Sequence, residues 1–147
     1  MKSLLKRLVV HVSIAVVLVS PALAKPPVVH EEMGKTLNVA RKKEKLGIYL
    51  LGTASCTYCK ALKRRIEEGE VSINADSFVM ADLNERDPQV RNAFFKQFDI
   101  KGVSTFTMPY VVIASSRGKL LVSWTGPKNS PAIEKLVQEA KSKAAAK

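Results

Sequence analysis

The sequence predicts an α/β fold in which helices flank a central mixed sheet of about four strands. In the first half of the chain, short apolar runs alternate with segments whose apolar residues recur every three or four positions. This alternation is typical of strands joined by helices, and it implies a right-handed parallel crossover. In the second half, two apolar runs lie on either side of a short turn at residues 115–118, which indicates an antiparallel hairpin.

The first 24 residues have the layout of a secretory signal peptide. A basic start with Lys2, Lys6 and Arg7 precedes an apolar stretch over residues 8–19, and a small-residue cleavage site ends at Ala24. The apolar stretch is shorter than the ~20 residues that a membrane-spanning helix needs. We therefore expect cleavage after Ala24 and export to the periplasm or a similar compartment. An uncleaved membrane anchor is the alternative.

Cleavage would leave one domain over residues 25–141 and a flexible basic tail over residues 142–147. A chain of this length can build one hydrophobic core, but it has no room for a separate dimerisation domain. The formal net charge of +11 falls to +8 when the signal peptide is removed. Most basic residues fall on the outer faces of predicted helices, and no interleaving of basic and aromatic residues indicates nucleic-acid binding.

The elements before the hairpin follow from local signals. Residues 25–30 read as a Pro-rich exit from the cleavage site, and a helix is plausible over residues 31–45 because Met33, Leu37 and Ala40 share one face. Residues 46–51 are a continuous apolar run, as expected of a buried central strand. Ser55 is the expected N-cap of the next helix. That helix should cover residues 56–68, with Cys59, Leu62 and Ile66 facing the sheet.

The second half of the chain is read in the same way. A strand is expected over residues 77–83, and Asp87-Pro88 marks the start of a helix that continues to Phe98. The two strands of the hairpin should occupy residues 109–114 and 119–124. A last helix, on which Ile133, Leu136, Val137 and Ala140 recur, is expected to end before the basic tail.

Cys56 and Cys59 are the only two cysteines, and they flank Thr57-Tyr58 at the start of a predicted helix. A disulfide across four residues closes almost no loop, so a purely structural bridge would stabilise the fold little. A structural zinc site usually needs four ligands, and only His30 remains as a histidine after cleavage. A redox-active pair is the better interpretation.

The position of Cys56 predicts which thiol attacks first. A helix N-terminus offers unpaired N–H groups and partial positive charge, which favour the thiolate. Lys60 and Lys63 lie one and two turns further on, where they would add positive field. Cys59 is one turn deeper on the same face, so it would resolve the mixed disulfide that Cys56 forms.

These motifs, taken in order, resemble the thioredoxin superfamily over residues 45–141. The resemblance rests on the Cys56–Cys59 motif between a strand and a helix, on the segment 98–103, on Met108-Pro109 at the start of a strand, on Arg117-Gly118 in the hairpin and on Gly126 after it. It implies a thioredoxin fold with a cis peptide bond before Pro109, packed against the active-site disulfide. It also implies that Met108 presents backbone groups to an extended substrate chain. Thr57 and Tyr58 would contact the same substrate.

The sequence departs from the family pattern at several positions. Leu50 stands six residues before Cys56, where thioredoxins have a buried acid, and Ser55 replaces the usual tryptophan. Thr57-Tyr58 replaces the Gly-Pro centre of cytosolic thioredoxin. About five extra residues, 104–108, separate the Gly-Val step from Pro109.

Other polar and aromatic residues have plainer interpretations. Trp124 is expected in the core, and Asp82 is expected to be a turn acid at the end of a strand. His30, Glu31 and Glu32 look like a solvated helix start.

The sequence therefore predicts an exported thiol–disulfide oxidoreductase that uses Cys56 and Cys59 and needs no cofactor. Its partners would be proteins with disulfides or dithiols and, by analogy with the family, a membrane-bound electron donor. A copper(I) metallochaperone that uses both thiolates is one alternative. A redox-inactive interaction protein that keeps the fold is another.

Overall fold

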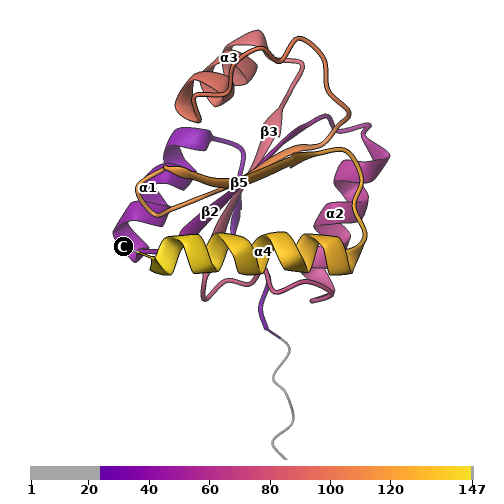
Figure 1. Cartoon of the computed structure of the whole chain (residues 1–147). Coiled ribbons are helices and arrows are strands. Elements are labelled where there is room, and N and C mark those ends of the chain that lie inside the picture. Colours follow the sequence, from indigo (N-terminus) through magenta and orange to yellow (C-terminus); the bar gives the residue numbers. More distant parts are fainter. Residues whose placement is uncertain (1–23, 147) are drawn as a thin grey trace, which may run out of the picture.

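A computed structural model describes residues 24–146 of the chain, in which strands and helices largely alternate (Figure 1). The predicted signal peptide, apart from Ala24, lies outside the described residues. The elements in chain order are β1 (Val29–His30), α1 (Met33–Lys43), β2 (Leu46–Gly52), α2 (Thr57–Glu67), β3 (Phe78–Asn84), α3 (Pro88–Gln97), β4 (Tyr110–Ala114), β5 (Leu120–Thr125) and α4 (Ser130–Ala145).

The sheet has five strands in the order β1-β3-β2-β4-β5. Strands β1, β3 and β2 are parallel, whereas β4 is antiparallel to both β2 and β5. The structure confirms the predicted parallel crossover and antiparallel hairpin, and the sheet has five strands where about four were expected. Strand β1 lies within the segment that was interpreted as an irregular exit, and its two residues are too few to show a periodic pattern. It joins the sheet through backbone pairing, in which Val29 lies opposite Met80.

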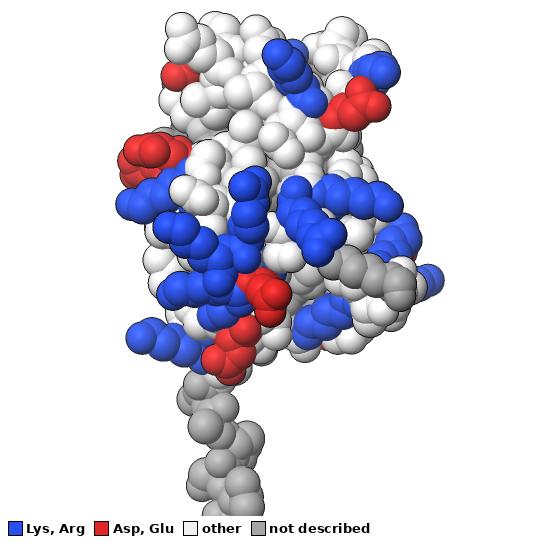
Figure 2. Space-filling model, turned by 90° about the vertical axis from the view of Figure 1, so that its left-hand side faces the viewer, with Lys and Arg blue, Asp and Glu red and all other residues white. Residues whose placement is uncertain are grey.

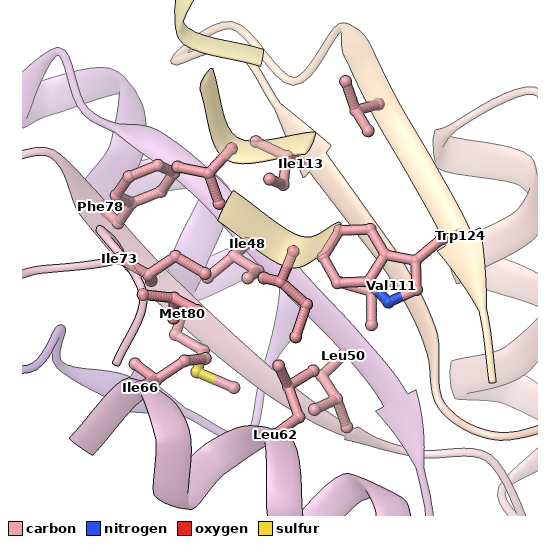
Figure 3. Close-up of a cluster of buried hydrophobic side chains, with 14 of the residues drawn as sticks. Ile48, Leu50, Leu62, Ile66, Ile73, Phe78, Met80, Val111, Ile113 and Trp124 are labelled. Atoms are coloured by element: carbon pink, nitrogen blue, oxygen red, sulfur yellow. The ribbon is translucent and has the colours of Figure 1, made fainter. Parts of the chain in front are cut away.

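Strand β2 is the centre of the sheet and carries side chains into two separate cores. Residues 48–51 are fully buried, as expected of a strand covered on both faces. Ile48 and Leu50 belong to the core beneath α2 and α4, which Figure 3 shows in close-up. Tyr49 and Leu51 belong to the opposite core, beneath α1 and α3.

Aromatic rings dominate the core on the α1 and α3 side. The Phe94 ring is fully buried and meets the rings of Phe98 and Tyr110 edge-on, at centroid distances of 5.2 and 5.7 Å. Such edge-to-face pairs add stability beyond the burial of their area. Burial raises the pKa of the Tyr49 hydroxyl well above its ordinary value. Its oxygen has no hydrogen-bond partner in the described part of the chain.

Helix α1 begins two residues later than predicted, at Met33, and the start of α2 differs from the prediction in its capping residue. Asp87 caps α3 as expected, since its carboxylate accepts hydrogen bonds from the amides of Gln89 and Val90. The N-cap of α2, however, is Cys56 and not Ser55. The helix begins one residue later than predicted because the Cys56 sulfur accepts a hydrogen bond from the Cys59 amide, a bond that a cap residue normally accepts with oxygen.

Helix α4 continues to Ala145, beyond the predicted domain end at Lys141. Its Glu134 carboxylate reaches back to the loop before β3, where it accepts a hydrogen bond of 2.8 Å from the Ser72 amide. Burial tends to raise the pKa of Glu134, but hydrogen bonds from Ser72 and Gln138 and the charge of Lys141 lower it, and the net shift is downward.

Figure 2 shows the side of the molecule that carries α1, where lysine and arginine side chains clearly outnumber acidic ones. Helix α1 ends there on Arg41, Lys42 and Lys43, all of which are exposed. Cations at this end of a helix are favoured by its dipole. Within residues 24–146, no helix is both long enough and apolar enough to span a membrane.

Candidate active site

Cys56 and Cys59 form a disulfide where β2 gives way to α2, with their Cα atoms 5.3 Å apart. Cys56 is 9% exposed and Cys59 is 1% exposed, so only the first cysteine meets solvent to any extent. The Cys56 sulfur lies 3.1 Å from the Cys59 amide nitrogen at the helix N-terminus. In the reduced protein, the same amide would stabilise a Cys56 thiolate.

Gly52, the last residue of β2, lies against the Cys59 side chain. A methyl group placed on Gly52 would collide with the Cys59 sulfur and would lie 3.3 Å from Leu50. A glycine at this position therefore lets the Cys59 sulfur pack directly against the strand backbone. Sequence reasoning treated Gly52 only as the end of an apolar run. The contact with Cys59 depends on how α2 docks onto the sheet.

A cleft of about 480 Å³ opens beside the first cysteine and contains four of the six predicted site residues. Its lining residues are Cys56, Thr57, Tyr58, Thr107 and Met108. Tyr58 is 52% exposed and adds an apolar ring to the rim. Thr107 was not singled out from the sequence, where nothing distinguishes it from its neighbours in the loop.

Pro109 is buried at the start of β4, and the Met108–Pro109 peptide bond is cis. The Gly126 amide anchors both sides of this bond, donating to the carbonyl oxygens of Thr107 at 2.8 Å and Pro109 at 2.9 Å. Met108 lies between these anchored residues and also packs against the core that contains both cysteines. The structure therefore brings Met108, which directly precedes Pro109, to Cys56 from a distant part of the sequence.

The extra residues 104–108 form a loop that is tied to α3. The Phe106 ring packs edge-on against Phe95 and Tyr110, at centroid distances of 6.0 and 5.2 Å. Arg91 donates a hydrogen bond to the Ser104 carbonyl oxygen at 3.1 Å and forms an ion pair with Glu85. The loop that carries Thr107 and Met108 is thus held by contacts on both sides.

Two charged residues near the motif differ from expectation. Asp82 lies inside β3 and not in a turn, and its carboxylate forms a 2.6 Å ion pair with Lys63 of α2. Since Lys63 is committed to this pair, its field at Cys56 is largely offset. Leu50 is fully buried and points toward Leu62 in an apolar setting (Figure 3).

The remaining residues discussed from the sequence lie away from this site or serve the core. Trp124 is 7% exposed and belongs to the core on the α2 and α4 side, as predicted. His30 belongs to β1 and is only partly exposed, so it is not part of a solvated helix start. Over residues 24–146, no group of three or more histidine, cysteine, aspartate or glutamate side chains is arranged to hold a metal ion.

Comparisons with known proteins place this geometry among known folds. No protein-family model and no curated protein sequence matches the chain. Solved structures match over most of its length. A candidate disulphide isomerase from Bacteroides thetaiotaomicron shares 16% identity, with a TM-score of 0.57 over 86% of this chain and 99% of the other.

Two thioredoxins match similarly. A mutant thioredoxin from Halobacterium salinarum shares 16% identity, with a TM-score of 0.55 over 82% of this chain and 96% of the other. Thioredoxin f from spinach chloroplast shares 17% identity, with a TM-score of 0.54 over 83% and 99%. Together with the Cys56–Cys59 disulfide at the start of α2, these likenesses show that the chain has the thioredoxin fold.

Proposed function

We propose that this protein is a thiol–disulfide oxidoreductase. Cys56 attacks a substrate disulfide as a thiolate, forms a mixed disulfide with one substrate sulfur, and is released when Cys59 attacks the Cys56 sulfur. The substrate disulfide is reduced to two thiols while the enzyme dithiol is oxidised to the Cys56–Cys59 disulfide. Run in reverse, the same steps oxidise a substrate dithiol.

The asymmetry between the two cysteines is the observation that carries this proposal. Cys56 caps α2 beside an open cleft, whereas Cys59 is buried one turn further along the same helix. An incoming disulfide can reach the first sulfur, and only the first sulfur can then present the mixed disulfide to the second. A structural bridge would need no such difference in access, and it would stabilise the fold little at this spacing.

The cleft supports an extended polypeptide as the substrate. The Tyr58 ring and the Met108 side chain flank Cys56, and a chain lying between them would run alongside the Met108 backbone. The backbone amide and carbonyl of Met108 take part in none of the loop hydrogen bonds found in residues 24–146. Backbone pairing at such a segment adds affinity without demanding a particular substrate sequence.

The cellular location of the protein and its partners are also part of the proposal. The signal-like N-terminus favours an exported protein whose clients are disulfide-containing proteins of the cell envelope. By analogy with the thioredoxin family, a membrane-bound donor would keep such a reductase reduced. Mass spectrometry of the protein recovered from the exported fraction tests the first point, and a chain that begins at Lys25 is the expected result.

Equilibration of the mature chain in glutathione buffers tests the redox function. A reversible two-electron couple should appear in the wild type and vanish in Cys56→Ser. A potential near thioredoxin's ~−270 mV would indicate a reductase, whereas one near ~−120 mV would indicate a dithiol oxidase. With a disulfide substrate, Cys59→Ser should accumulate a mixed disulfide on Cys56 that mass spectrometry detects. Absence of any reversible couple refutes the proposal and makes copper(I) titration of the reduced protein the next measurement.

A further inference from the structure

A second cleft, of about 710 Å³, lies behind the loop that leads into α2 and is strongly polar. Its walls come from the end of β2 and the loop after it, from α2, from the end of β3 and from the start of α3. The residues that matter for the chemistry are Gly52, Lys63, Asp82 and Asp87. The redox steps described so far use none of these charged groups.

The ion pair in this cleft occupies an unusual position in the sheet. Phe78 and Met80 precede Asp82 at alternate positions of β3 and pack into the core beneath α2, so Asp82 points to the same face. In the parallel register, Asp82 lies directly opposite Leu50 of β2. Its carboxylate and the Lys63 ammonium are each 31% exposed, and they meet at 2.6 Å. A charge placed at the margin of an apolar core needs such a partner.

The cleft reaches the resolving cysteine through a single glycine. Gly52 lines the cleft, and its α-carbon also lies against the Cys59 sulfur. Lys63 follows Cys59 by four residues on α2, which places the two side chains on neighbouring turns of one face. Gly52 therefore lies between the cleft that contains Asp82 and the Cys59 sulfur. A polar space of this size is large enough for water molecules to connect the two groups.

The second redox step needs a proton acceptor near Cys59. Cys59 attacks only as a thiolate, yet it is buried among apolar side chains that disfavour the charged form. The other carboxylates of the cleft are poorly suited to accept its proton, because Glu31 is exposed to solvent and Asp87 is bound to two amides of α3. Leu50, the buried neighbour in β2, has no titratable group.

We propose that Asp82 accepts the proton of Cys59 through a water molecule in this cleft, and that Lys63 holds the carboxylate in position. The inference rests on the proposed redox function and concerns only its second step. The Cys59 S–H bond breaks and its proton moves to Asp82. The thiolate then forms a bond to the Cys56 sulfur, the bond from Cys56 to the substrate sulfur breaks, and the substrate leaves as a thiolate that takes up a proton.

Stopped-flow measurement with 5,5′-dithiobis(2-nitrobenzoate) separates the two steps. With the reduced protein in excess, attack by Cys56 releases one coloured thiolate in a phase whose rate depends on concentration. Attack by Cys59 releases the second in a phase whose rate does not. The Cys59→Ser variant should lack the second phase, which identifies that phase as the attack by Cys59. If the wild type shows no first phase, the redox function itself fails, and that result is distinct from any effect of Asp82.

Asp82→Asn keeps the shape of the side chain and removes the proton acceptor. We expect the first phase to be unchanged and the second phase to slow on the order of a hundredfold near neutral pH. The difference from the wild type should shrink as pH rises, because hydroxide then removes the Cys59 proton directly. Lys63→Gln keeps the carboxylate but removes the charge that positions it, so it should slow the second phase less than Asp82→Asn does, and Asp82→Glu should retain part of the wild-type rate. Asp76→Asn is the matched control, since Asp76 is exposed outside the cleft.

The sign of the effect distinguishes proton transfer from a simple effect of charge. Removing a nearby negative charge while leaving Lys63 in place would favour the Cys59 thiolate, so a purely electrostatic role predicts a faster second phase. A second phase in Asp82→Asn that is unchanged or faster overturns the proposal. Slowing by the same factor at every pH also overturns it, because a displaced helix α2 would have that effect.

Discussion

Replacing Gly52 by alanine is expected to destabilise the oxidised protein, although alanine usually suits a strand better than glycine does. The added methyl group would occupy space that the Cys59 sulfur already fills, and Leu50 closes a second side at 3.3 Å. Neither neighbour can move freely, because Cys59 is tied to Cys56 and Leu50 is fully buried. The collision must therefore shift the backbone of β2 or the start of α2.

The magnitude follows from two opposing terms. Overpacking a well-packed core costs about 1–3 kcal/mol. Reduced freedom of the unfolded chain returns about 0.4–1 kcal/mol for a change from glycine to alanine. With central values of about 2 kcal/mol for the first term and about 0.7 kcal/mol for the second, the net free energy of unfolding should fall by about 1.3 kcal/mol. For a domain of this size, that corresponds to a fall in Tm on the order of 4 °C per kcal/mol.

Urea unfolding of the oxidised protein, followed by far-UV circular dichroism, measures this change. Gly34→Ala is the matched control, because an added methyl group at Gly34 of α1 would meet nothing within 4 Å. That variant should be stabilised by about 0.5–1 kcal/mol, as expected when alanine replaces glycine in a helix. If Gly52→Ala is as stable as the wild type or more stable, Cys59 does not pack against β2 as described.

Three further predictions address the cap, the core and pH. Asp87→Ala should lower the free energy of unfolding by about 1 kcal/mol through loss of the α3 cap, whereas Asp76→Ala should change it by less than about 0.5 kcal/mol. Equal effects of the two changes would contradict the cap. Phe94→Ala should cost about 3–5 kcal/mol in urea unfolding, because the ring is fully buried among other rings. A loss below about 1 kcal/mol would mean that the site is loosely packed. The pKa of Glu134 is lowered in the folded protein, so its contribution to stability is complete above the ordinary glutamate pKa and is lost as pH falls through the folded value. Glu134→Gln should therefore lose less stability than the wild type between pH 7 and pH 3, and an equal loss would refute the role of Glu134.

Much of the fold can be predicted from the sequence because its signals are local. The apolar run 46–51, the capping pair Asp87-Pro88 and the apolar spacing on α2 each depend on neighbouring residues alone. The structure has an element at each of these places, within one or two residues of the predicted bounds. Strand β1 was missed for the complementary reason. Its two residues are ordered by backbone pairing with β3, 51 residues further along the chain, and not by any pattern of their own.

At the site, the sequence by itself determined the two thiols, their spacing and their place between a strand and a helix. Only the tertiary structure decided what surrounds them. The sequence does not show that Gly52 abuts Cys59, that Thr107 and Met108 line the cleft at Cys56, or that Lys63 pairs with Asp82. Each of these contacts joins residues from different parts of the chain, so each depends on how α2, strands β2 and β3 and the loop before β4 pack together. Local propensity sets the elements, whereas long-range packing sets which side chains meet.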